Sequence, residues 1–329
     1  MMKEAFLFGI VLALTVAGGA GTPGESADYP ARTIIVINPM AAGGSRDVVA
    51  RTFATVGEKY LGQPIVVINK PGASGMIGGR AGAQAAPDGY TLTVVSTGDI
   101  CALEWEAASG RKPLYTLGDF TTLGAFTVSP ALVVVPPGSA WKTLADLVKD
   151  CQAKSNHYAF ASGGKYGIVH ISLEILMRAA GFKARQVPYP GGGPALNAVV
   201  GGHVDFSAQY PSTSIPLARG KKLKILAVMD NKRLNSIPNV PTTVEQGVQA
   251  EIDQMVGLVV PQNTPTPIVE KLRGTVAKVV KDKIFIDALT ALGEDIDYLN
   301  GEQLVKYFET KSAIIRNVIV EIAKEELPK

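Results

Sequence analysis

The chain has 329 residues, of which 47% are hydrophobic and 19% are charged. This length is typical of about two domains, and the composition excludes a disordered chain. The net charge of +3, without a basic cluster, argues against a nucleic-acid partner.

Residues 1–27 have the pattern of a secretory signal peptide. Lys3 supplies a positive charge, an apolar run follows at 5–17, and the small residues after it predict cleavage after Ala20 or Ala27. An uncleaved membrane anchor is the alternative, but the apolar run is shorter than the ~20 residues that span a bilayer. We therefore expect a mature protein that is exported and soluble.

The first predicted unit is a strand at 33–38, a glycine-rich loop at 39–45 and a helix at 46–61. The strand is a short apolar run bounded by turn residues, which indicates a central parallel strand. Ser45 is the expected N-cap, and Asp47 is a carboxylate in the first turn of the helix. The first amides of a helix lack intrahelical acceptors and attract anions. We therefore expect this loop to hold one carboxylate of a small organic acid.

Further strands and helices alternate along the chain and form two blocks of βα units, whereas residues 113–130 have no clear pattern. In parallel sheets, ligands bind beyond the carboxyl ends of the strands, so the loops at 39–45, 69–75 and 97–99 should converge. The predicted strands are 64–68, 90–96, 131–135, 158–162, 185–189, 204–208, 223–228 and 257–261, and the predicted helices are 75–86, 144–153 (capped by Thr143), 169–180, 194–200, 267–281, 284–292 and 302–326.

The C-terminal helices have no third sheet to cover, so we expect them to pack on the first block. Lobe one is then 28–129 together with 255–329, and lobe two is 130–254. The fold class is α/β, with a mostly parallel sheet and flanking helices in each lobe. The two chain crossings would form a hinge, and the cleft between the lobes is the expected small-molecule site.

Five motifs occur in order along the chain: NPMAAGGSRDVVAR (38–51), LGQPIVVINKPGASGMIG (61–78), APDGYTL (86–92), VPYPGGGPALNAVVGGHVDF (187–206) and IPNVPTTVEQG (237–247). Together they resemble the extracytoplasmic solute-binding proteins of tripartite tricarboxylate transporters, the Bug family. The resemblance extends from Tyr29 to the final helix.

This resemblance implies a two-lobed periplasmic binding protein of type II-like architecture that delivers a small organic carboxylate to a membrane permease. We expect a monomer with no chemical step and no cofactor, and the three histidines argue against a metal site. Lobe one would bind the carboxylate through backbone amides and bridging water at 40–47 and 71–75, and lobe two would close with the loop at 162–167 and with His170. The candidate ligand-binding residues are Met40, Ala42, Gly43, Gly44, Ser45, Asp47, Gly72, Ala73, Ser74, Thr97, Ser162, Gly163, Gly164, Lys165, His170, Tyr189, Gly191 and Tyr210.

The chain departs from the family pattern at a few of these positions. Met40 replaces an aromatic residue, Ala42 replaces Pro, and Lys165 and Tyr166 occupy a loop that usually holds Gly and Ser. Lys165 is either a solvated charge or a partner for a ligand carboxylate. Asp47 would order its loop rather than act as a base, because it would repel an anion at close range.

The alternative function is a periplasmic hydrolase of a carboxylate-containing small molecule. No GxSxG motif surrounds Ser45, and Ser162 has no recognisable partner in the sequence. The spacing of the glycines at 72–78 is GxxGxxG, which does not match the dinucleotide fingerprint. Cys101 and Cys151 match no metal motif, and they are either a disulfide or two separate buried thiols.

Overall fold

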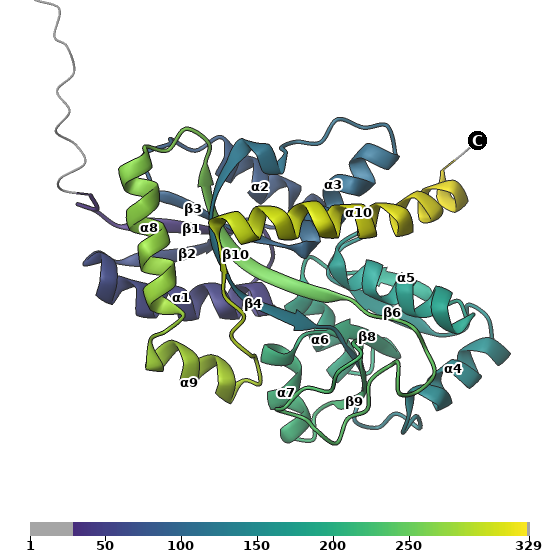
Figure 1. Ribbon diagram of the computed structural model, residues 1–329. Helices are drawn as coiled ribbons and strands as arrows, with labels where there is room; N and C mark the ends of the chain where they lie inside the picture. Colours follow the sequence, from purple (N-terminus) through teal and green to yellow (C-terminus); the bar gives the residue numbers. More distant parts are fainter. Residues whose placement is uncertain (1–28, 328–329) are drawn as a thin grey trace, which may run out of the picture.

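A computed structural model describes residues 29–327 and places them in two α/β lobes, each built on one sheet (Figure 1). The predicted signal peptide at 1–27 lies outside the described residues. Within 29–327, no helix combines the length and the hydropathy needed to cross a bilayer.

The first sheet contains the predicted N-terminal βα units and a later strand that returns to them. Its first three strands run parallel with β1 at their centre, as predicted, whereas β10 and β11 run in the opposite direction. The order across the sheet is β11 (Leu299–Asn300), β4 (Phe120–Pro130), β10 (Asp253–Pro261), β3 (Thr91–Ser96), β1 (Ile34–Asn38) and β2 (Ile65–Asn69).

The second sheet is built from the middle of the chain. All of its strands run in one direction except β5, which is antiparallel to both of its neighbours. Both sheets are therefore mixed, with most strands parallel in direction. The order is β7 (Arg185–Pro188), β6 (Ala159–Ser162), β8 (Phe206–Gln209), β5 (Leu132–Val135) and β9 (Lys224–Val228).

Helices flank both sheets, and most of them match the predicted ranges. They are α1 (Ser45–Leu61), α2 (Met76–Ala83), α3 (Thr97–Ala108), α4 (Leu144–Ala153), α5 (Ile168–Ala180), α6 (Gly192–Val200), α7 (Pro211–Arg219), α8 (Thr266–Val279), α9 (Lys283–Ala291) and α10 (Gly301–Glu326), with short 3₁₀ turns at Ala73–Gly75 and Leu117–Asp119.

Two helices and two strands, β4 and the two-residue β11, were not predicted. In α3 most side chains are buried, so the sequence has no amphipathic stripe to reveal a helix. In α7, Pro211 and Pro216 hide a helix, because proline normally marks a helix start or a break. The long strand β4 falls in the segment that had no clear pattern.

The C-terminal helices return to the first lobe, as predicted. Helices α8 and α9 pack on α1, where Phe126 contacts Phe53 and Phe285 with ring centroids 5.1 and 5.6 Å apart. Each such ring contributes about 1.5–3 kcal/mol to stability by its burial. Helix α10 lies along α3 and β4 and ends beside α5 of the second lobe (Figure 1).

The two cysteines are buried on different helices. Cys101 lies in α3 and Cys151 lies in α4, and both are free thiols. Burial raises the pKa of Cys151 to about 12, so this thiol stays protonated at neutral pH. Of the two alternatives left open by the sequence, the structure has two separate buried thiols.

Glu294 is buried where the lobes join, and it gives the fold a pH dependence. Its carboxyl accepts hydrogen bonds from the Ser129 hydroxyl of β4 and from the Ser212 N–H of α7, the latter at 3.0 Å. Burial raises the pKa of Glu294, and the hydrogen bonds offset that effect only in part. Its stabilising contribution is therefore complete below the unfolded-state pKa and is lost as the pH rises through the folded-state pKa.

We expect Glu294→Gln to raise the melting temperature near neutral pH and to leave it nearly unchanged at about pH 4, where both side chains are neutral. Scanning calorimetry of both proteins at both pH values measures this. The same shift at the two pH values would contradict a titrating carboxyl at this position.

Candidate ligand-binding site

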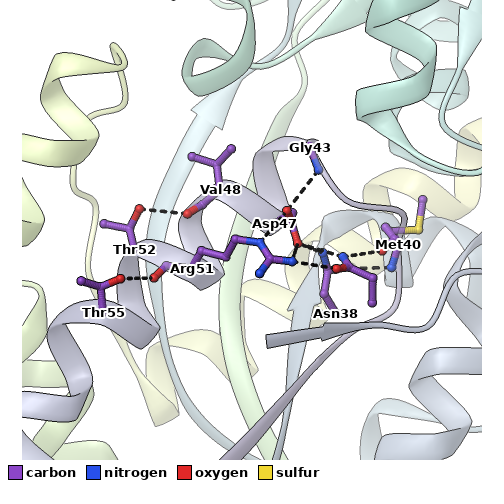
Figure 2. Close-up of polar contacts among 9 residues, drawn as sticks. Asn38, Met40, Gly43, Asp47, Val48, Arg51, Thr52 and Thr55 are labelled. Atoms are coloured by element: carbon purple, nitrogen blue, oxygen red, sulfur yellow. Dashed lines mark hydrogen bonds and ion pairs between the residues drawn. The ribbon is translucent and has the colours of Figure 1, made fainter. Parts of the chain in front are cut away.

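Asp47 holds the loop between β1 and α1 in place. Its carboxylate accepts hydrogen bonds from Arg51 Nε at 2.9 Å, from Arg51 Nη2 at 3.0 Å, from Asn69 Nδ2 at 2.8 Å and from the Gly43 N–H at 3.1 Å (Figure 2). Burial would raise the pKa of Asp47, but these hydrogen bonds outweigh it and hold the pKa below its usual range. Asp47 is therefore an ionised residue that orders the loop.

The start of α1 differs from the prediction by one residue. Gly44 is the N-cap and Ser45 is the first helical residue, so the prediction of Ser45 as N-cap was wrong. The Ser45 hydroxyl instead accepts a hydrogen bond from Gln254 Nε2 of β10 at 2.6 Å. Because the N-cap is a glycine, the first amides of α1 have no side-chain cap.

Glycines allow the two lobes to approach each other closely. The Ser74 hydroxyl of lobe one donates to the Lys165 carbonyl at 2.6 Å. A Cβ atom on Gly193 would lie 2.6 Å from the Ala42 carbonyl oxygen and 2.8 Å from the Gly43 carbonyl carbon, so only glycine fits there. The structure is therefore a closed arrangement of the lobes.

A second set of contacts joins the lobes near the end of α10. The rings of Trp105 and Tyr166 stack with centroids 3.4 Å apart. The Tyr166 hydroxyl donates to Glu326 at 2.6 Å, and Arg178 pairs with Glu325 at 2.9 Å. Lobe two thus contacts both α3 and α10.

A cavity of about 50 Å³ lies between the two lobes. One water needs about 10–15 Å³ of such space, so the cavity has room for a few waters or a compact solute. Its lining residues come from strand ends and from the first turns of helices. They are Met40, Ala41, Gly44, Ser45, Arg46, Asp47, Ser74, Ser96, Gly98, Gly163, Gly167, Ile168, Val169, Gly192, Gln209, Tyr210 and Gln254.

Five helices begin at this cavity. Lining residues include Gly44, Ser96, Gly167 and Tyr210, the N-caps of α1, α3, α5 and α7, and also Gly192, the first residue of α6. The first amides of a helix lack intrahelical acceptors, and its N-terminus carries a partial positive charge. The arrangement therefore favours an anion in the cavity.

The structure brings together part of the predicted set. Predicted residues that line the cavity are Met40, Gly44, Ser45, Asp47, Ser74, Gly163 and Tyr210. The loops after β1, β2 and β3 all contribute, as expected from the carboxyl ends of parallel strands.

The other predicted residues do not line the cavity. Thr97 and His170 make internal contacts: the Thr97 hydroxyl accepts a hydrogen bond from the Met255 N–H at 2.9 Å, and His170 Nδ1 accepts one from the Tyr166 N–H at 3.0 Å. The residues that do not line the cavity are Ala42, Gly43, Gly72, Ala73, Thr97, Ser162, Gly164, Lys165, His170, Tyr189 and Gly191.

The sequence analysis missed several lining residues, some of which carried a signal. Ser96 is followed three residues later by Asp99, a capping-box pattern that marks a helix start. Arg46 is a charged residue that directly follows a glycine-rich loop. Gln254 carried no signal, because it is 209 residues from its partner Ser45.

Lys165 points away from the cavity. Its ammonium pairs with Glu326 of α10 at 2.7 Å and lies 4.8 Å from the centroid of the Tyr166 ring. An exposed pair of this kind contributes about 0–1 kcal/mol. We therefore expect Lys165→Met to weaken acid binding by at most about fivefold, equally for succinate and butyrate. A calorimetric titration in which only succinate loses affinity would contradict this placement.

Comparisons with known proteins bear on the family and the fold of this chain. A family model described as tripartite tricarboxylate transporter family receptor matches residues 49–323. The chain is also similar to three solved structures. MatC from Rhodopseudomonas palustris with bound malate has a TM-score of 0.81 and 29% identity, with 88% of this chain and 100% of that chain covered.

The second structure is the periplasmic binding protein BugD, with a TM-score of 0.83, 27% identity, and 90% and 99% of the two chains covered. The third is an R. palustris protein with adipate, with a TM-score of 0.83, 25% identity, and 90% and 99% covered. The two-lobed α/β fold is thus the fold of periplasmic binding proteins.

Proposed function

Because the chain belongs to the tripartite tricarboxylate transporter receptor family, we propose that it is a periplasmic receptor for a small organic carboxylate. It captures the acid between its lobes and delivers it to a membrane permease. The observation that carries this proposal is the convergence of five helix N-termini on one small cavity between the lobes. The malate and adipate in two similar structures support a carboxylate as the ligand.

Binding and closure follow from the arrangement of the loops. The loop ordered by Asp47 presents the first amides of α1, so one carboxylate is held by backbone donors. Lobe two then swings onto the acid and adds the starts of α5, α6 and α7. The small cavity favours compact acids over bulky ones, because an enclosed site must hold the whole ligand.

No chemical step is part of this proposal. A hydrolase needs a nucleophile within hydrogen-bond reach of a base. Within residues 29–327, the Ser45 hydroxyl accepts a hydrogen bond from Gln254, and the Ser162 hydroxyl accepts one from Gln186 at 2.7 Å. Neither partner is a base, so we propose a receptor that releases its ligand unchanged to the permease. We also propose that the receptor acts as a monomer.

A thermal-shift screen of the purified mature protein tests the function. The panel contains succinate, malate and adipate, with neutral succinamide as the matched control for succinate. A ligand at a hundred times its Kd stabilises the native state by about 2.7 kcal/mol, so at least one acid should raise the melting temperature by several degrees. A shift with succinamide and none with any acid would overturn the proposal.

A further inference from the structure

Arg46 is a buried cation at the edge of the cavity. It is the second residue of α1, lines the cavity, and is 6% exposed. Burying a guanidinium is costly unless its N–H groups find acceptors. The contacts of Arg46 therefore show whether acceptors within the protein satisfy all of its N–H groups.

The protein satisfies Arg46 only in part. Nη2 donates to the Val94 carbonyl at 2.6 Å and pairs with Asp99 Oδ2 at 2.9 Å. Nε is buried and has no hydrogen-bond partner among the described residues. A guanidinium has five N–H groups, and among the described residues only those of Nη2 find acceptors, so donors remain on this cavity-lining side chain for a ligand.

Asp99 does not depend on Arg46 for its hydrogen bonds. It accepts one from the Ser96 N–H at 2.7 Å and another from the Tyr115 hydroxyl at 2.8 Å. These two donors occupy both carboxylate oxygens and fix the start of α3. Arg46 therefore supplies a positive charge beside Asp99, and the guanidinium N–H groups that contact neither Asp99 nor Val94 remain free.

The other charged side chains near the cavity are already in ion pairs within the protein. Among its lining residues, the only other charged side chain is Asp47, which is paired with Arg51. Lys165, which the sequence suggested as a counter-charge for the ligand, pairs with Glu326 instead. Arg46 is thus the cationic side chain that the cavity offers to a ligand.

We propose that Arg46 is a specificity-determining residue whose free N–H groups bind a second anionic group of the ligand. The backbone amides at the helix starts hold one carboxylate, and Arg46 holds the other. The receptor therefore prefers a dicarboxylate over the monocarboxylate of the same length. This inference rests on the proposed function and names the class of acid within it.

Calorimetric titration with matched acid pairs tests the inference: succinate against butyrate, and adipate against hexanoate. Arg46→Met alone would leave Asp99 buried without a counter-charge, so the first variant is Arg46→Met with Asp99→Asn. The second is Arg46→Lys, which keeps the charge beside Asp99 and loses the planar fork. Tyr115→Phe is the control, because it alters the Asp99 cluster without touching the cavity lining.

We expect the wild-type protein to bind the dicarboxylate of at least one pair more tightly. A charge-assisted hydrogen bond lost from the double variant should weaken that acid about ten- to a hundredfold and the monocarboxylate less than about threefold. Arg46→Lys should lose part of the same preference, and Tyr115→Phe should keep it.

Equal losses for both acids in a variant with a native circular-dichroism spectrum, or no loss at all, would overturn the inference and leave the proposed function intact. Wild-type protein that binds neither these acids nor any acid of the thermal-shift panel would overturn the proposed function as well. The two failures are distinguishable, because one is seen in the variants and the other in the wild-type protein.

Discussion

Gly193→Ala should weaken ligand binding about 5- to 150-fold and leave both lobes folded. Its new methyl group would lie 2.6 Å from the Ala42 carbonyl oxygen when the lobes are closed, and overpacking of this kind costs about 1–3 kcal/mol. Alanine at this position in α6 should favour the helix itself by about 1 kcal/mol. The variant therefore opposes closure without opposing folding.

Calorimetric titration measures the affinity, and small-angle X-ray scattering with ligand measures closure. Gly274→Ala is the matched control, because Gly274 is also helical and a Cβ atom there would have nothing within 4 Å. It should bind ligand as the wild-type protein does. Wild-type affinity in Gly193→Ala, with a compact liganded form, would show that the lobes do not close along this contact.

Asp47→Ala should destabilise the protein by about 2–3 kcal/mol and weaken ligand binding at least tenfold. The substitution removes the acceptor for Arg51, Asn69 and the Gly43 N–H, and hydrogen bonds to charged groups contribute about 1.5–3 kcal/mol (Figure 2). Arg51 is half-exposed, so its share is small. Urea unfolding and calorimetric titration measure the two effects.

The contribution of Asp47 to the stability of the protein should depend on pH. Because its folded-state pKa is lowered, its stabilising contribution is complete above the unfolded-state pKa and is lost as the pH falls through the folded-state pKa. The stability difference between wild-type protein and Asp47→Asn should therefore shrink below about pH 4. Thr55→Ala, on the exposed side of the same helix, is the control and should change neither quantity.

A constant difference across the acid range would mean that Asp47 acts through its shape rather than its charge. Normal ligand affinity in Asp47→Ala would mean that the loop after β1 does not need this network to bind the acid.

The sequence predicts elements best where local chemistry marks both of their ends. Thr143 was expected to cap α4, and it forms a capping box there with Asp146. Gly181 was expected to end α5, and it adopts the left-handed conformation that suits glycine. Such signals depend on a few neighbouring residues and need no knowledge of the tertiary fold.

The elements and contacts that the sequence did not predict depend on interactions between distant segments. Strand β4 pairs with β10 more than a hundred residues later, and no local pattern reports that pairing. Lys165 was suggested as a ligand partner, but its ion pair with Glu326 is formed by the return of α10 across the lobes. The Gln254 contact with Ser45 likewise exists only once β10 has joined the first sheet.

The lobe boundaries predicted at 129 and 255 fall at the ends of two strands of the first sheet, β4 and β10. They remain a prediction about where the chain bends, because bending is a difference between open and closed forms. Scattering of the unliganded protein would measure the extent of that difference.

The most direct measurement is a crystal structure of the protein with the dicarboxylate that raises its melting temperature most. We predict that this acid lies between the lobes, with one carboxylate within hydrogen-bond distance of the first amides of α1 and with donors from the starts of α5 and α6 around it. An acid bound on the outer surface, with only water between Gly44 and Gly192, would contradict the account.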